Sequence, residues 1–313
     1  MTALRIGARG SLLSVTQTSW VAEQIRAQGV SVEIKTIKTT GDKIVDVPLA
    51  KIGGKGLFVK EIEEALLSGE IDLAVHSMKD MPTKIPEGLH IGAVPKRENP
   101  YDALITRDGV LWKDLPFGAR IGTASLRRQS QLKRSRPDLL FFPLRGNLDT
   151  RLKKLFSGTS AANGEMDAIV LAAAGLHRMG WKEKITEYLP AAISLPAIGQ
   201  GALAIECRKD DAKVNAAIAF LNDSKSAAEI AAERALMIRL EGGCQTPIAG
   251  FALESNGEIT LEGVVLSLDG TKRVHIKKTA PVACASDLGE TVGEMLLAAG
   301  ADVILREILD QQE

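Results

Sequence analysis

The sequence predicts a two-lobed α/β protein that ends in a small α+β domain. Strand and helix patterns alternate from the first residues, and a stretch with the composition of a linker, Pro95 to Pro100, precedes a second α/β pattern. A second hinge-like stretch, Ser194 to Gly201, follows that second half. Nearer the C-terminus, the pairs Asn256-Gly257 and Asp269-Gly270 are typical of type I′ turns between antiparallel strands.

Length and composition agree with more than one domain and argue against some functions. The 313 residues exceed the size, about 250–300 residues, at which a single core stops growing. The 39 Lys and Arg residues balance 39 Asp and Glu residues, so no overall field attracts the protein to nucleic acid or to a membrane. Aromatic residues make up only 4%, which argues against a base-stacking surface. We expect neither a nucleic-acid partner nor a membrane partner.

The distribution of apolar runs, cysteines and histidines also limits the possibilities. No apolar run reaches the roughly 18 residues that cross a bilayer, and the first residues lead into a strand pattern without a signal peptide. Cys207, Cys244 and Cys284 are odd in number and far apart, and the four histidines are scattered. We therefore expect a cytoplasmic protein with no disulfide framework and no metal site.

The N-terminal part has a β-α-β pattern. Leu4 to Gly7 reads as a strand, Ser11 can cap a helix from Leu12 to Ala27, and Val30 to Ile37 is a β-branched, alternating strand. This pattern indicates a parallel sheet, whose binding sites lie at the carboxyl ends of its strands.

A loop rich in glycine and lysine, Lys51 to Phe58, follows. It lacks the spacing of a phosphate-binding Walker loop, so it is either a solvated surface loop or a lid over a charged ligand.

Beyond a helix at 58–67, a buried strand at 71–75 runs into Ser77, Lys79 and Asp80. On an extended backbone Lys79 and Asp80 point to opposite sides, so one can bind substrate while the other handles protons. The alternative is a surface ion pair.

The second α/β half is locally basic. Strands are expected at 120–123, 139–144 and 167–172, with one helix opened by the stretch 124–128 and another at 148–156. Between Arg120 and Lys154 the sequence has ten basic residues against two acidic ones. Arginine forks bind carboxylates and phosphates in a bidentate manner, and helix N-termini add N–H donors. The pattern therefore predicts an anion site rather than a nucleic-acid surface.

Cys244 lies on a short loop, Glu241 to Pro247, after an alanine-rich helical pattern from Ala227 to Leu240. A glycine after the helix can supply the left-handed turn that ends it, and Pro247 prevents the helix from resuming. This placement suits a sulfur that carries a group. The alternative is a buried cysteine that acts as a small apolar residue.

Six stretches in this order resemble the porphobilinogen deaminase (hydroxymethylbilane synthase) family of tetrapyrrole biosynthesis. They cover nearly the whole chain, and together they are highly specific. They are PLAKIGGKGLFVKE at 48–61, HSMKD at 76–80, SLRRQ at 125–129, LRGN at 144–147, LPAIGQG at 195–201 and EGGCQ at 241–245.

The resemblance implies three domains. The first two are lobes similar to type II periplasmic binding proteins, joined by crossing hinges, and the third is a small α+β domain with a three-stranded antiparallel sheet. Domain 1 is expected at 1–96 and 199–220, domain 2 at 101–194 and domain 3 at 222–313. A monomer is also expected.

The resemblance further implies a dipyrromethane cofactor, bound through a thioether to Cys244. The family joins four porphobilinogens head to tail on this cofactor, releasing ammonia, and then frees hydroxymethylbilane by hydrolysis. The partners are thus porphobilinogen and the growing linear oligopyrrole. Asp80 resembles the catalytic acid, which would stabilise the azafulvenium cation left by ammonia. Lys55 and Phe58 belong to the loop that would close over the site.

Each pyrrole ring carries an acetate and a propionate, which explains the need for clustered cationic and hydroxyl groups. By motif position, the residues that resemble the family's cofactor and substrate binders are Arg9, Ser11, Gln17, Ser77, Lys79, Thr123, Ser125, Arg127, Arg128, Arg145, Gly146, Arg151, Arg178 and Gln200.

Two other functions stay open at this point. A non-enzymatic two-lobed anion-binding protein, or the effector domain of a regulator, would explain the hinges and the arginines but not Cys244. A cysteine-thiolate hydrolase would explain the cysteine, yet no histidine lies in a recognisable nucleophile context.

Overall fold

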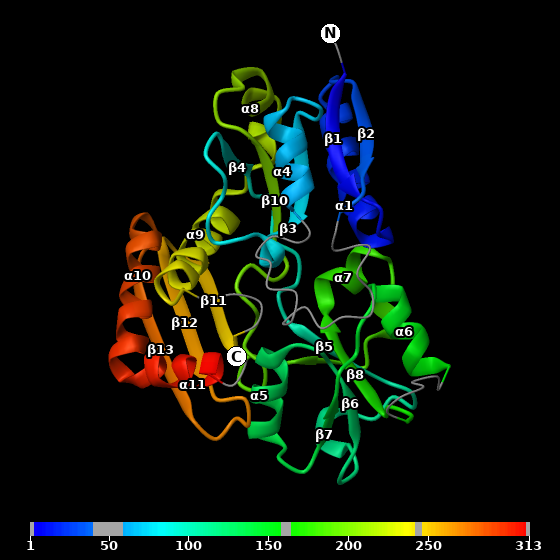
Figure 1. Ribbon diagram of the computed structural model, residues 1–313, viewed down its shortest axis with the longest axis vertical. Helices are drawn as coiled ribbons and strands as arrows, with labels where there is room; N and C mark the ends of the chain where they lie inside the picture. Colours follow the sequence, from blue (N-terminus) through cyan, green and yellow to red (C-terminus); the bar gives the residue numbers. More distant parts are fainter. Residues whose placement is uncertain (1–2, 40–58, 158–163, 242–245, 311–313) are drawn as a thin grey trace. The chain divides into compact units, whose positions relative to one another are not determined.

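The computed structural model describes residues 3–39, 59–157, 164–241 and 246–310 (Figure 1). The chain divides into two compact units. The first contains Met1–Glu98 and Ala202–Ala227, and the second contains Asn99–Gly201 and Ala228–Glu313. The chain therefore passes from the first unit to the second and returns before its C-terminal part begins.

The first unit is built on a five-stranded mixed sheet in the order β2-β1-β3-β10-β4. Strands β1, β2 and β3 are parallel to one another, whereas β10 is antiparallel to both β3 and β4. The strands are β1 (Leu4–Arg9), β2 (Val32–Ile37), β3 (Leu73–Ser77), β4 (Leu89–Ala93) and β10 (Leu203–Arg208).

Helices cover both faces of this sheet. Helix α1 (Leu12–Ala27) buries Val21 and Ile25 against one face, together with α8 (Ala212–Ile218). Helix α4 (Lys60–Leu67) buries Ile62 and Leu66 in a separate cluster that includes Ala74. Because both faces are covered, β3 and β10 are buried along almost their whole length.

The second unit contains a sheet with the same topology, in the order β7-β6-β8-β5-β9. Strand β6 is parallel to β7 and β8, and β5 is antiparallel to β8 and β9. The strands are β5 (Asp102–Thr106), β6 (Arg120–Gly122), β7 (Leu140–Phe142), β8 (Ala168–Ala172) and β9 (Glu187–Leu189).

Side chains that alternate along β5 fill two separate cores in this unit. Ala103 and Ile105 pack with α6 (Leu148–Phe156) and α7 (Ala173–Arg178), whereas Leu104 packs with α5 (Leu126–Ser135) on the other face.

The antiparallel strand inserted in each sheet is the one that follows a crossing between the units. Strand β5 comes directly after the first crossing, and β10 comes directly after the return. This exchange of strands is the crossing-hinge arrangement of type II periplasmic binding protein lobes. The predicted fold class is therefore confirmed.

The C-terminal part forms a three-stranded antiparallel sheet of β11 (Ile248–Ser255), β12 (Glu258–Leu266) and β13 (Arg273–Pro281). Helix α9 (Ser224–Arg239) leads from the first unit into the second, and α10 (Ala285–Leu296) and α11 (Asp302–Asp310) complete the chain. Leu236 of α9 and Val292 of α10 belong to the same buried cluster as the inner face of this sheet. Figure 1 shows these helices in yellow to red beside the strands.

Some local expectations need correction. The Asn256-Gly257 turn has positive φ at both residues, as a type I′ turn requires, but Leu266 pairs with Arg273, so the loop around Asp269-Gly270 is longer than two residues. The final helical stretch is interrupted at Gly300, which has a φ of 99°. After α9 the left-handed residue is Glu241, with a φ of 50°, whereas Gly242 lies outside the described residues.

The exact three-domain boundaries stay a prediction. The second compact unit contains the residues assigned to both the second and the third domain.

Candidate active site

Site residues of the first unit gather at the carboxyl edge of its sheet. Since β1 and β3 are parallel, their C-terminal ends lie at one edge. Arg9 ends β1, and Ser11 is the N-cap of α1, where its hydroxyl accepts a hydrogen bond from the Ser14 N–H at 3.3 Å. Ser77 ends β3, and the side-chain amide of Gln17 donates to its hydroxyl at 3.2 Å. Arg9, Ser11, Gln17 and Ser77 thus lie near this edge, and their role as binders stays a prediction.

Lys79 and Asp80 follow directly in a 3-10 turn, Met78–Asp80. The extended backbone expected here is therefore wrong, although successive residues of a 3-10 turn also project in different directions. Met78 is buried and anchors the turn, since its N–H donates to the Ala202 carbonyl at 3.0 Å. Asp80 is exposed at this edge, so its carboxylate is accessible to a ligand.

A second set of predicted site residues lies at the carboxyl edge of the parallel strands in the second unit. The C-terminal ends of β7, β6 and β8 lie at one edge. Thr123 and Ser125 follow β6, Arg145 and Gly146 follow β7, and Arg178 ends the helix that follows β8.

Hydrogen bonds hold the loops at this edge in place. Ser125 is the N-cap of α5, and its N–H donates to the hydroxyl of buried Thr123 at 3.3 Å. Gly146 has a φ of 109°, and its carbonyl accepts a hydrogen bond from the Arg151 guanidinium at 2.7 Å. Arg178 donates to the Gly201 carbonyl at 2.6 Å. The site residues after β6, β7 and β8 therefore hold defined positions.

Arg127 and Arg128, in the first turn of α5, are buried in this structure. Their guanidinium groups both pair with Asp102, at 2.9 Å for Arg127 and 2.8 Å for Arg128. Burial alone would raise the pKa of Asp102, but the charges of Arg127 and Arg128 outweigh it and hold that pKa well below its usual range. Burial also lowers the pKa of Arg127. Within the part of the chain that the structure describes, the two guanidinium groups share the carboxylate of Asp102, so these three side chains carry a formal charge of +1.

Gln200 joins the same cluster from the return crossing. Its side-chain amide donates to Asp102 at 2.9 Å and to the Pro100 carbonyl at 2.6 Å. Sequence reasoning missed Asp102 and Ser194, which both lie in this cluster. The available signal was Asp102 itself, a charged residue at the start of the otherwise apolar run Ala103 to Ile105.

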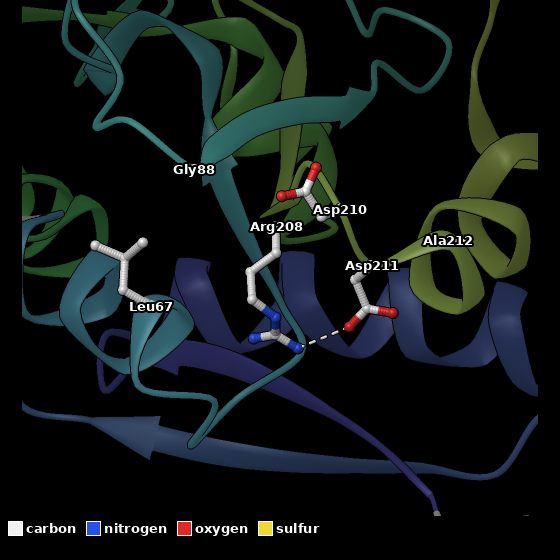
Figure 2. A pocket seen from close by; sticks show the side chains of 6 residues that line it. All are labelled: Leu67, Gly88, Arg208, Asp210, Asp211 and Ala212. Carbon is white, nitrogen blue, oxygen red and sulfur yellow. Dashed lines mark hydrogen bonds and ion pairs between the residues drawn. The ribbon is translucent and has the colours of Figure 1, made fainter.

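A surface pocket in the first unit lies away from these residues (Figure 2). It is lined by Leu67, Gly88, Arg208, Asp210, Asp211 and Ala212. The one arginine that lines this pocket, Arg208, already has partners within the protein. It donates to the carbonyls of Leu66 and Ile71 and pairs with Asp211. Arg208 also ends β10, which is antiparallel to β3, so this pocket is at the sheet edge opposite Asp80. It does not suit a carboxylate ligand.

Three predicted site residues, Lys55, Phe58 and Cys244, lie outside the described residues. Within the described ranges, no group of three or more His, Cys, Asp or Glu side chains could hold a metal ion. Guanidinium, hydroxyl and amide donors dominate both carboxyl edges, and such donors fit the carboxylates of an oligopyrrole.

The fold and these two edges define a class: a protein with two lobes of the type II binding kind, whose sheet edges carry guanidinium, hydroxyl and amide donors, extended by a small α+β domain. Residues 4–216 match the family model for the porphobilinogen deaminase dipyrromethane cofactor binding domain, and residues 227–298 match the model for the C-terminal domain of porphobilinogen deaminase. The chain belongs to the porphobilinogen deaminase family.

Curated relatives extend over nearly the full length. The porphobilinogen deaminase of Geobacter metallireducens is 52% identical over 99% of this chain and 96% of its own length. The porphobilinogen deaminase of Syntrophobacter fumaroxidans is 52% identical over 97% of each chain. Among solved structures, the methionine binding protein MetQ aligns with a TM-score of 0.43 and 13% identity over 70% of this chain and 89% of that chain, too weak a likeness to indicate a ligand.

Proposed function

We propose that this protein is a transferase that condenses four porphobilinogen molecules head to tail on a covalently bound dipyrromethane, releases ammonia at each step, and then frees hydroxymethylbilane by hydrolysis. The observation that carries this proposal is the carboxyl edge of the second sheet. There, among the described residues, Arg127 and Arg128 share the carboxylate of Asp102 and so retain one formal positive charge at the start of α5. Family membership over nearly the whole chain favours this function over a non-enzymatic anion-binding protein.

The sulfur of Cys244 is the proposed attachment point of the cofactor. When bound, the dipyrromethane supplies the nucleophilic pyrrole carbon to which the first substrate is joined. On either side of the Cys244 loop, the chain has fixed ends: Glu241 ends the helical segment in a left-handed conformation, and Pro247 is buried beside β11. Anchored ends support a role as a tether.

The polar residues at the two carboxyl edges bind the acetate and propionate groups of cofactor and substrate. Charged and hydroxyl donors held by neighbouring hydrogen bonds bind carboxylates with little loss of side-chain entropy. The proposed set is Arg9, Ser11, Gln17, Ser77, Lys79, Thr123, Ser125, Arg127, Arg128, Arg145, Gly146, Arg151, Arg178 and Gln200.

Asp80 is the proposed catalytic residue. Its exposed carboxylate would face the pyrrole N–H of the substrate and stabilise the positive charge that develops as ammonia leaves. The same carboxylate can accept and return protons at the leaving amine and at the new ring junction. A carboxylate on a turn anchored by buried Met78 keeps its position during these transfers.

Further features complete the proposal. Lys55 and Phe58 belong to a loop that closes over the bound substrate. The protein works as a cytoplasmic monomer without nucleic-acid or membrane partners, with domains at 1–96 plus 199–220, 101–194 and 222–313. Every helix in the described part of the chain is too short or too polar to cross a bilayer.

Intact-protein mass spectrometry tests the proposal. The natively purified protein should exceed its encoded mass by two pyrrole units and consume porphobilinogen, whereas Cys244→Ser should have the encoded mass and no turnover. Cys284→Ser serves as the matched control, because Cys284 is a partly exposed free cysteine. A wild-type mass equal to the encoded mass, even after incubation with porphobilinogen, would reject the proposed function.

A further inference from the structure

Asp102 is the centre of a buried network in the second unit. It begins β5 and has no exposed surface. Its Oδ2 atom accepts hydrogen bonds from Arg127 Nη1 at 2.9 Å and from Ser194 Oγ at 2.7 Å. Its Oδ1 atom accepts from Arg128 Nε at 2.9 Å and from Gln200 Nε2 at 2.9 Å. Both carboxylate oxygens are thus fully used.

The donors come from two separate stretches of the chain. Arg127 and Arg128 belong to the first turn of α5, whereas Ser194 and Gln200 belong to the stretch that leads back to the first unit. Arg127 also donates to the Leu195 carbonyl at 2.6 Å, and Arg128 donates to the Val170 carbonyl at 3.0 Å. Asp102 therefore fixes the two guanidinium planes to the sheet and to the return stretch together.

Electrostatics makes the carboxylate necessary for this arrangement. Two buried guanidinium groups without a counter-charge repel each other and lose their hydration, which opposes their burial. One carboxylate offsets that cost but balances only one of the two charges. The residual charge favours a ligand carboxylate at a position that the protein has already organised.

We infer that Asp102 is a positioning residue, which orients Arg127 and Arg128 so that they bind the carboxylates of the cofactor as it is acquired. This inference rests on the proposed function, and it assigns Asp102 no contact with the reacting atoms.

The chain offers a matched control in the first unit. Asp72 also lies between two arginines, at 2.7 Å from Arg5 and 3.3 Å from Arg208. It is nearly buried, but it precedes β3 and lies at the edge opposite Asp80. Asp72→Asn therefore removes a carboxylate shared by two arginines without touching the proposed site.

The experiment compares Asp102→Asn, Asp72→Asn and wild type. Apoprotein of each is incubated with porphobilinogen, and the rate of covalent mass gain is measured per folded molecule. We expect Asp102→Asn to gain mass at least about tenfold more slowly than wild type, and Asp72→Asn to stay within about twofold even where its melting temperature falls. Equal slowing in both variants, or a wild-type rate in Asp102→Asn, would overturn the inference.

A milder variant covers the case in which Asp102→Asn does not fold. Ser194→Ala removes one hydrogen bond to Asp102 but keeps all three charges. We expect it to gain mass about threefold more slowly than wild type, a small effect of the size of one hydrogen bond. An unchanged rate in a variant with confirmed folding would count against positioning by Asp102.

A second readout separates this inference from the proposed function. Phenylglyoxal modifies accessible arginines, and peptide mapping locates them. In wild-type protein Arg127 and Arg128 should resist modification, whereas in Asp102→Asn both should react faster by about tenfold or more, as expected for released guanidinium groups. If wild type gains no mass at all, the proposed function fails and this readout alone decides: unchanged reactivity in Asp102→Asn overturns the inference.

Discussion

The Nε2 atom of His76 on β3 lies 3.0 Å from the Oε2 atom of Glu206 on β10, and both side chains are buried. Glu63 on α4 faces this pair. Burial first, and then the charge of Glu206, raise the pKa of Glu63 to about 7, whereas His76 opposes the shift. The Oε1 atoms of Glu63 and Glu206 have no hydrogen-bond partner among the described residues. The Glu63 carboxyl group therefore resists ionisation in the folded state.

This cluster predicts a pH-dependent stability. Because the pKa of Glu63 is higher in the folded state than its ordinary value, the folded state binds the proton more tightly. The associated stability is present below about pH 4.5 and is lost as the pH rises to about 7. Glu63→Gln removes the ionisation. At pH 8 its free energy of unfolding should therefore be about 1–2 kcal/mol higher than that of wild type, and this difference should shrink toward pH 4.5.

Urea unfolding at several pH values measures this difference. Glu64→Gln is the control, because Glu64 is an exposed neighbour on the same helix, and it should change the free energy of unfolding by less than about 0.5 kcal/mol. A Glu63→Gln difference that stays constant from pH 4.5 to pH 8 would contradict the prediction.

Asp80→Asn should fold normally and lose most of its activity. The side chain is exposed, so its charge contributes little to folding, but removal of an electrostatic stabiliser lowers kcat by about 100- to 1000-fold. Steady-state consumption of porphobilinogen and a thermal melt test both halves of this prediction. Asp210→Asn, at the opposite edge, removes another exposed carboxylate and should keep kcat within about twofold. Near-normal turnover by Asp80→Asn would remove its proposed role.

Arg128→Lys should impair cofactor acquisition although it conserves the charge. The guanidinium of Arg128 makes separate contacts with Asp102 and the Val170 carbonyl, which an ammonium group cannot reproduce in the same planes. We expect the rate of mass gain with porphobilinogen to fall by about tenfold or more, the size expected for a lost buried charge-assisted contact. Arg134→Lys, an exposed position on the same helix, should acquire the cofactor at the wild-type rate. Equal rates for the two variants would argue against Arg128 as a binder.

Gly270→Ala should destabilise the protein more than Gly257→Ala. Both glycines have a positive φ, 78° and 80°, so alanine costs about 1–2 kcal/mol of backbone strain at either position. At Gly270 the added Cβ would also clash with the Ser130 carbonyl oxygen of α5, whereas nothing lies within 4 Å at Gly257. The β12–β13 loop must therefore move off α5.

The expected difference between these two alanine variants is about 1–3 kcal/mol in the free energy of unfolding, measured by urea titration. Equal losses in the two variants would show that the loop adapts without cost. Because α5 carries Arg127 and Arg128, slower cofactor acquisition by Gly270→Ala is also expected.

Local patterns predicted most elements well. The helices at Leu12–Ala27 and Leu148–Phe156 begin and end as expected, and Ser11 is the N-cap that the sequence predicted. Capping and helical periodicity depend on residues within a few positions of one another, so the sequence is sufficient to identify them. The longer loop at Asp269-Gly270 was not predicted, because its length is set by the pairing of Leu266 with Arg273, which lie on two different strands.

By itself, the sequence determined the fold class, the family, and which residues gather at the carboxyl ends of parallel strands, since chain order and strand direction place them there. Only the tertiary structure decided that Arg127 and Arg128 share Asp102, and that Glu63 faces Glu206 and His76. These partners lie on different elements, and their charges interact strongly only because folding removes water from between them. Desolvation is a property of the packed molecule, so no local pattern could reveal it.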